Sequence, residues 1–171
     1  MNKRLLIILL IVLGIYAIAY QTEKNRTKLV ITTVESNQEI VHELIDSITT
    51  ATVYNAVPAQ CKKDCTHPAN PRFTIDLSRP GEHRILAMER TLRKKLGLQY
   101  GDILYIEGTD YDGYWQLQDC MNKRFAGQHK IDLLVDNSIR YGKWENVKIY
   151  KVNCTEQQKS DIIEKYMLAS L

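Results

Sequence analysis

Two aspartates, Asp119 and Asp132, each stand in an apolar, β-prone stretch of the sequence, which is an unusual place for a carboxylate. Residues 114–117 (Tyr-Trp-Gln-Leu) lead into the first, and residues 131–135 (Ile-Asp-Leu-Leu-Val) enclose the second. A half-buried strand normally keeps its inward positions apolar. A carboxylate with such neighbours is either paired or has its pKa raised by burial, so that it keeps its proton near neutral pH. Acids of this kind cleave glycosidic bonds, and the pattern therefore predicts that chemistry.

The same aspartates also have a purely structural interpretation, in which they cap turns or form ion pairs with Arg124, Lys130 or Arg140. The residue types are compatible with both interpretations, so both stay open at the level of the sequence. The sequence contains no motif of several other enzyme classes: it has no Gly-x-Ser-x-Gly elbow, no P-loop and no His-Glu-x-x-His sequence. Serine-hydrolase, nucleotide-binding and zinc-protease functions are therefore unsupported.

Short runs rich in β-branched and aromatic residues predict the strands that position these aspartates. They cover residues 52–55, 84–88, 103–107, 114–118, 131–135 and 147–152, with a further short run at 73–77. Gly108 and Gly113 mark turns between them. Many short strands with little helix between them favour a closed barrel over a parallel α/β sheet.

Three helices are predicted around the strands. Residues 36–39 have the Ser-x-x-Glu pattern of a capping box, and apolar residues at helical spacing then predict a short amphipathic helix over residues 40–48. A second short helix directs Leu92 and Leu96 inward. A third begins after Thr155, near the C-terminus.

The N-terminal residues 5–20 form an uncharged apolar run after Lys3 and Arg4. Its length lies between that of a signal-peptide core and the roughly 20 residues that span a bilayer. We favour a retained membrane anchor over a signal peptide cleaved after residues 17–19 (Ala-Ile-Ala), and both over a buried core helix. An anchor or a signal places the domain on the exported side of the membrane, in the cell envelope, or in the periplasm if the segment is cleaved.

The even number of cysteines agrees with an oxidising compartment in which disulfides form. Cys61 and Cys65 are close enough in sequence to clasp a small loop, which leaves Cys120 to join Cys154. A zinc site built from the first two cysteines and His67 is the alternative, but it lacks a fourth ligand nearby. We therefore predict disulfides, with no metal and no cofactor.

The length of the chain limits the number of domains, and its charge limits the kinds of partner that we expect. The 171 residues suffice for one domain with appendages, and the net charge of +3 with a pI near 8.6 is mild. The basic run at residues 93–95 is interpreted as the solvated face of a helix. We predict no nucleic-acid partner, because no basic run is interleaved with aromatic residues.

Four segments follow one another in a recognisable order. They are Leu-Ala-Met-Glu at residues 86–89, Gly-Asp-Ile-Leu-Tyr-Ile-Glu-Gly at 101–108, Leu-Gln-Asp-Cys-Met at 117–121 and Lys-Ile-Asp-Leu-Leu at 130–134. Over about residues 50–152, the chain resembles the three-aspartate (3D) domain, which is shared with membrane-bound lytic transglycosylase A and related to rare-lipoprotein-A-like domains. Glu89 stands where that family has its first aspartate, and residues 121–124 replace the glycines after its second.

The resemblance implies a mainly β fold, namely a six-stranded double-psi β-barrel with short helices. An N-terminal membrane helix and the short amphipathic helix precede it. The chain then divides into a membrane anchor or signal peptide at residues 1–20, a linker and amphipathic helix at 21–48, the barrel at 49–153 and a helical tail at 154–171.

The resemblance also implies a function, cleavage of peptidoglycan between N-acetylmuramic acid and N-acetylglucosamine to give a 1,6-anhydro product. Asp132 matches the family's catalytic acid, which acts as general acid and base. Asp119 and Glu89 are then supporting groups that hold up its pKa and orient sugar hydroxyls.

Further residues are candidates for binding the glycan. Tyr111, Tyr114 and Trp115 are placed to stack on sugar rings, or to serve as core and rim aromatics. Lys123 and Arg124 are candidate polar contacts. Two alternatives stay open: a non-catalytic peptidoglycan-binding or envelope-assembly module on the same barrel, and a phage-encoded lysis factor.

Overall fold

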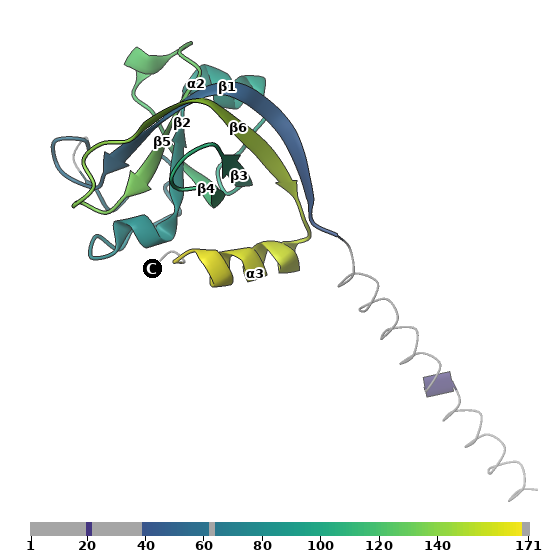
Figure 1. The fold of residues 1–171 in the computed structure, drawn as a ribbon. Helices are drawn as coiled ribbons and strands as arrows, with labels where there is room; N and C mark the ends of the chain where they lie inside the picture. The colour runs from purple at the N-terminus through teal and green to yellow at the C-terminus, as the bar shows by residue number, and fades with distance from the viewer. Residues whose placement is uncertain (1–19, 22–38, 62–63, 169–171) are drawn as a thin grey trace, which may run out of the picture. The chain divides into compact units, whose positions relative to one another are not determined.

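The computed structural model describes residues 20–21, 39–61 and 64–168. The chain divides into two units, residues 1–39 and 40–171, and the second contains a closed barrel of six strands (Figure 1). The predicted mainly β fold with a six-stranded closed barrel is therefore confirmed.

The elements follow one another along the second unit. Its strands are β1 (Val41–Asn55), β2 (Ile85–Met88), β3 (Ile103–Glu107), β4 (Gly113–Cys120), β5 (Lys130–Val135) and β6 (Lys143–Asn153). The helices described there are η1 (Pro80–His83), α2 (Arg90–Lys95), η2 (Lys123–Phe125) and α3 (Glu156–Tyr166), where η denotes a 3-10 turn.

The strand pairing has an internal two-fold symmetry. Around the barrel the order is β1-β5-β2-β4-β3-β6. The pairs β1–β5 and β2–β4 are parallel, and the other neighbouring pairs are antiparallel. Exchanging β1 with β4, β2 with β5 and β3 with β6 reproduces both the order and the strand directions. The first three strands are thus equivalent to the last three.

Alternate residues of the strands fill the barrel with one apolar core. Its strand residues are Ala51, Leu86, Met88, Leu104, Ile106, Trp115, Leu117, Ile131, Leu133, Val147 and Ile149. Two smaller clusters lie outside. Phe73 and Ile75 of the loop after β1 pack on β2 and β5, and Ile162 and Met167 pack on β3 and β6.

The amphipathic helix predicted over residues 40–48 is wrong, and the boundary at residue 49 with it, because β1 already begins at Val41. This first half of β1 pairs with β6, and the two run side by side as long curved strands (Figure 1). Irregularities interrupt the register at Leu44, Asp46 and Thr49. Val41, Leu44 and Ile48 contributed to the helical spacing, but they are exposed in β1, so that spacing did not mark a buried helix face.

Other local predictions have mixed outcomes. The short helix α2 and the C-terminal helix are confirmed, and Thr155 forms a capping box with Gln158 at the start of α3. The run at residues 73–77 is not a strand. The predicted membrane helix and linker lie outside the described residues, apart from Tyr20 and Gln21. Within the described part, no helix is long and apolar enough to cross a membrane.

The barrel core predicts a contrast between two leucines. Leu133 is fully buried in the core, whereas Leu77 is 42% exposed. Leu133→Ala should lower the free energy of unfolding by about 2–5 kcal/mol, because it leaves a cavity. Leu77→Ala should change it by less than about 0.5 kcal/mol. Urea unfolding measures both, and equal effects would contradict the packing described.

Candidate functional site

Backbone pairing places the two aspartates in one row across four neighbouring strands. Thr52 of β1 lies opposite Asp132 of β5, and Asp132 lies opposite Ala87 of β2. Ala87 in turn lies opposite Asp119 of β4. Residues directly opposite one another point to the same face of a sheet. Because the neighbouring Ile131 belongs to the core, this row faces outward from the barrel.

Asp132 is half-buried in this row, and Thr52 Oγ1 donates a hydrogen bond to its Oδ1. Burial raises the pKa of Asp132, and the charge of Asp119 raises it further. The bond from Thr52 and the charges of Lys130 and Arg124 act in the opposite direction. The net effect is a raised pKa, so Asp132 keeps its proton to a higher pH than an ordinary aspartate does.

Asp119 is held by three donors. Its Oδ1 accepts hydrogen bonds from the backbone amides of Ala69 at 2.9 Å and Cys120 at 2.7 Å, and its Oδ2 accepts one from the Tyr54 hydroxyl at 3.1 Å. Burial, and then the charge of Asp119, raise the pKa of Tyr54 well above its usual value. Tyr54 therefore remains a hydrogen-bond donor, and Asp119 is a fixed carboxylate on the same face as Asp132.

Asp119 also lines a cavity of about 320 Å³ between the end of β4 and the loop that follows β1. The Cys61–Cys65 disulfide closes that loop. The same loop presents Asp64 and His67 to the cavity, with 2.6 Å between Asp64 Oδ2 and His67 Nδ1. Cavities of this size accept small ligands. The lining includes Asp119 but not Asp132.

Glu89 has a different task from the one that the resemblance implied. It is 1% exposed and caps α2, where its oxygens accept hydrogen bonds from Thr91 N at 2.6 Å and Leu92 N at 2.8 Å. Burial raises the pKa of Glu89, but the amides of Thr91, Leu92 and Gly127 together lower it by more. Both oxygens serve the helix terminus, so Glu89 positions α2.

The predicted sugar-stacking aromatics lie away from the acid row. Trp115 is 1% exposed in the core, and its Nε1 donates to the carbonyl of Tyr111 at 3.0 Å. Tyr114 packs edge-on against Tyr105, with 5.3 Å between ring centroids, and contacts His42. These three side chains contribute to packing, and the structure does not bring them to Asp132.

Lys123 and Arg124 lie in η2, just before β5, and both are exposed. Arg124 is close enough to Asp132 for its charge to lower the pKa of that carboxyl, and its guanidinium lies 4.7 Å from the ring centroid of Phe125. Of the predicted binding residues, Arg124 is therefore the one that the structure associates with the acid row.

Sequence reasoning missed Thr52 and Tyr54, which bind the two aspartates. Both lie in the predicted strand at residues 52–55, two positions apart, so their alternation already placed them on one face. The missing information was which strands lie nearby. Parallel pairing of β1 with β5 brings Thr52 to Asp132, 80 positions away, and the closed barrel brings Tyr54 to Asp119, 65 positions away.

One of the two predicted disulfides is present. Cys61 and Cys65 are joined, with 5.3 Å between their Cα atoms, whereas Cys120 and Cys154 are free. The predicted Cys120–Cys154 pair is wrong because β3 separates β4 from β6, which places these residues roughly 10 Å apart across the sheet. The disulfide also uses both sulfur atoms of the alternative zinc site, and the described residues hold no cluster with metal-ligand character.

No protein-family model matches this chain, and no curated protein matches it in sequence. Its function is therefore inferred from the site.

The capping role of Glu89 predicts a pH-dependent loss of stability. Glu89→Ala should lower the free energy of unfolding by about 0.5–2 kcal/mol. Because the pKa of folded Glu89 lies below its usual value of 4.5, its contribution is complete above that pH and is lost as the pH falls through the lowered pKa. Glu145→Ala, which removes only an exposed pair with Lys143, is the control. A pH-independent effect in urea unfolding would contradict this role.

The cysteine arrangement predicts two free thiols. Thiol titration of the unreduced, denatured protein should count Cys120 and Cys154 only, and peptide mapping should find Cys61 cross-linked to Cys65. Four free thiols, or a cross-link between Cys120 and Cys154, would disprove the arrangement.

Proposed function

We propose that this protein is an exported lytic transglycosylase-like enzyme that cleaves peptidoglycan glycan strands between N-acetylmuramic acid and N-acetylglucosamine. The observation that carries the proposal is the outward-facing row in which Asp132, with its raised pKa, is separated from Asp119 by one intervening strand, β2. An acid with a raised pKa, in one row with a second aspartate that hydrogen bonds hold in place, suits protonation of a glycosidic oxygen.

The barrel is proposed to be of the double-psi type. The two-fold symmetry of its strand pairing supports this assignment, because each of the two parallel pairings joins a strand of the first half to a strand of the second, and the symmetry relates one pairing to the other. Both aspartates lie on strands of these parallel pairs, Asp132 on β5 and Asp119 on β4. The topology thereby accounts for their common row.

In the proposed reaction Asp132 acts first as acid and then as base. Its proton passes to the bridging oxygen as the glycosidic bond breaks. The 6-hydroxyl of the muramic residue then bonds to the anomeric carbon, and its proton returns to Asp132. The product is a 1,6-anhydro sugar, and no water is consumed. One acid suffices because the substrate supplies the nucleophile, unlike in hydrolases that use two carboxylates.

The neighbouring groups set the protonation state of this acid. The charge of Asp119 favours the protonated form of Asp132 before cleavage, whereas Thr52, Lys130 and Arg124 limit the rise of its pKa. Asp119 is occupied by three donors, so its role is electrostatic. Arg124 is exposed near the acid and is proposed to contact the glycan.

The proposed location is the cell envelope, on the exported side of the membrane, with residues 1–20 as anchor. The Cys61–Cys65 disulfide supports an oxidising compartment. Peptidoglycan is the proposed partner of the domain. A phage-encoded lysis factor would use the same chemistry in another biological setting.

A non-catalytic peptidoglycan-binding or envelope-assembly module is the second candidate. One observation favours it: the cavity beside the row is lined by Asp119, His67 and Arg90 but not by Asp132. Such a cavity offers polar groups for sugar hydroxyls without presenting the acid to them.

Asp132→Asn separates the two candidates. It should reduce the release of 1,6-anhydro muropeptides by about 10²- to 10⁴-fold, because the amide cannot supply the proton. Asp119→Asn should reduce release less. Asp136→Asn, a matched change at an exposed position just after β5, is the control and should keep full activity. Mass spectrometry of digested peptidoglycan measures the product.

Stability measurements distinguish a catalytic effect from unfolding. Because the pKa of Asp132 is raised in the folded protein, folding favours the protonated form. The stabilisation by protonated Asp132 is complete below about pH 3.8 and is lost as the pH rises through the raised pKa. Asp132→Asn should therefore not lower the melting temperature at neutral pH. Wild-type turnover in this variant would refute catalysis, and sedimentation with peptidoglycan without cleavage by the folded wild type would favour the binding module.

A further inference from the structure

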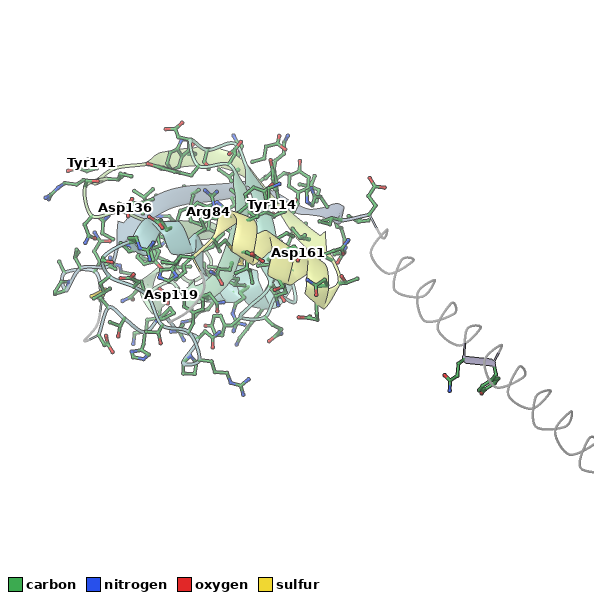
Figure 2. The ribbon with its side chains drawn as sticks, turned by 90° about the horizontal axis from the view of Figure 1, so that it is seen from below. Arg84, Tyr114, Asp119, Asp136, Tyr141 and Asp161 are labelled. Atoms are coloured by element: carbon green, nitrogen blue, oxygen red, sulfur yellow. A yellow bond between two sulfur atoms is a disulfide. The ribbon has the colours of Figure 1, made fainter. Side chains whose placement is uncertain are left out.

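A second and larger cavity, of about 490 Å³, lies beside the last turn of α3, apart from the acid row. This open cavity is bordered by η1, the start of β2, the end of β5 and the chain after α3. Leu168 closes it on one side, since its amide donates to Glu82 O at 2.7 Å and its carbonyl accepts from His83 Nδ1 at 2.9 Å. Figure 2 labels Arg84 and Asp136, which line this cavity, and Asp119, which does not.

Arg84 presents a cation to this cavity. Its Nε donates to Tyr114 O at 2.7 Å, and its Nη2 donates to the carbonyls of Tyr111 at 2.9 Å and Asp112 at 3.1 Å. The guanidinium lies over the ring of Trp115, with 4.3 Å from Cζ to the ring centroid. These contacts fix the group in place and leave Nη1 without a hydrogen-bond partner among the described residues.

The charge of Arg84 is incompletely compensated. Within the described part of the chain no carboxylate forms an ion pair with it, because its three partners are neutral carbonyls. Burial lowers the pKa of Arg84, and the more distant charge of Asp112 opposes this. Among the described residues, Nη1 of Arg84 is not one of the buried side-chain atoms that lack a hydrogen-bond partner, and Arg84 itself is half-buried. A half-buried guanidinium with a free N–H is suited to a carboxylate.

Carboxylates also line the cavity. Glu82 lies 3.4 Å from Arg79 Nη1, and Asp136 accepts a hydrogen bond from Gly81 N at 3.2 Å. Glu164, in the last turn of α3, is exposed and has no ion-pair partner among the described residues. The lining of the cavity thus includes a guanidinium and a carboxylate that have no ion-pair partner among the described residues.

Apolar residues also line the cavity, and of these Ile139 and Leu168 are the partly exposed ones. Its apolar lining residues are Trp115, Leu134, Val135, Ile139, Met167 and Leu168. Lys165 also lines the cavity, with its Nζ 5.1 Å from the ring centroid of Tyr166. A ligand that satisfies the whole surface carries a carboxylate, an ammonium group and an apolar body.

We propose that this cavity binds a small zwitterion, an amino acid or dipeptide with an apolar side chain, whose carboxylate accepts from Arg84 Nη1 and whose ammonium group contacts Glu164. The site is distinct from the acid row and does not depend on the function proposed for it.

Three matched probes test the proposal by amide NMR titration of the full chain. Leucine carries both charges, 4-methylpentanoate lacks the ammonium group, and 3-methylbutan-1-amine lacks the carboxylate. Leucine should shift the amides of Ile139 and Met167, and each analogue should bind at least about tenfold more weakly, because each loses one charge-assisted hydrogen bond.

Variants of α3 assign the ammonium contact. Glu164→Gln should weaken leucine binding about tenfold and leave 4-methylpentanoate binding unchanged. Glu156→Gln, on the same helix but outside the cavity, should change neither. Arg84→Lys is a weaker test, because loss of the carbonyl contacts also loosens the turn before β4.

Three outcomes would overturn the proposal: no shifts with millimolar leucine, equal binding of all three probes, or identical behaviour of Glu164→Gln and Glu156→Gln. Binding of 4-methylpentanoate that equals or exceeds that of leucine would also overturn it and would identify a site for apolar acids instead. None of these results bears on peptidoglycan cleavage, which Asp132→Asn measures separately.

Discussion

The pairing of β5 between β1 and β2 is the constraint on which the rest of the structure depends. This strand is parallel to β1 and antiparallel to β2, and it closes the barrel around a core that includes Ile131 and Leu133. Because side chains alternate along a strand, burying these two residues forces Asp132 onto the outer face. The position of the candidate acid thus follows from the packing of its neighbours.

The same closure sets the electrostatic contrast between the carboxylates. Burial raises the pKa of Asp132, and one hydroxyl hydrogen bond offsets only part of that rise. Glu89 is more deeply buried, yet its pKa is lowered because backbone amides of a helix terminus surround it. Asp132 and Glu89 therefore differ in the direction of their pKa shifts because they differ in their hydrogen-bond donors.

Segments outside the barrel form walls of both cavities described above. The loop after β1, closed by the Cys61–Cys65 disulfide, covers the outer face beside Asp119. The helix α3 packs Ile162 and Met167 against Ile103 and Val152 and forms one wall of the larger cavity. Both additions bury apolar surface of the barrel, and both leave polar side chains facing the space that they enclose.

The sequence by itself determined the strands from β2 to β6, the helices α2 and α3, and the Cys61–Cys65 disulfide. Alternation, capping residues and close spacing of cysteines are all local signals. It also singled out Asp119 and Asp132. Only the tertiary structure decided the strand identity of residues 41–48, the capping role of Glu89 and the separation of Cys120 from Cys154. Each depends on which strand lies beside which, and pairing between residues far apart in the chain leaves no local signal.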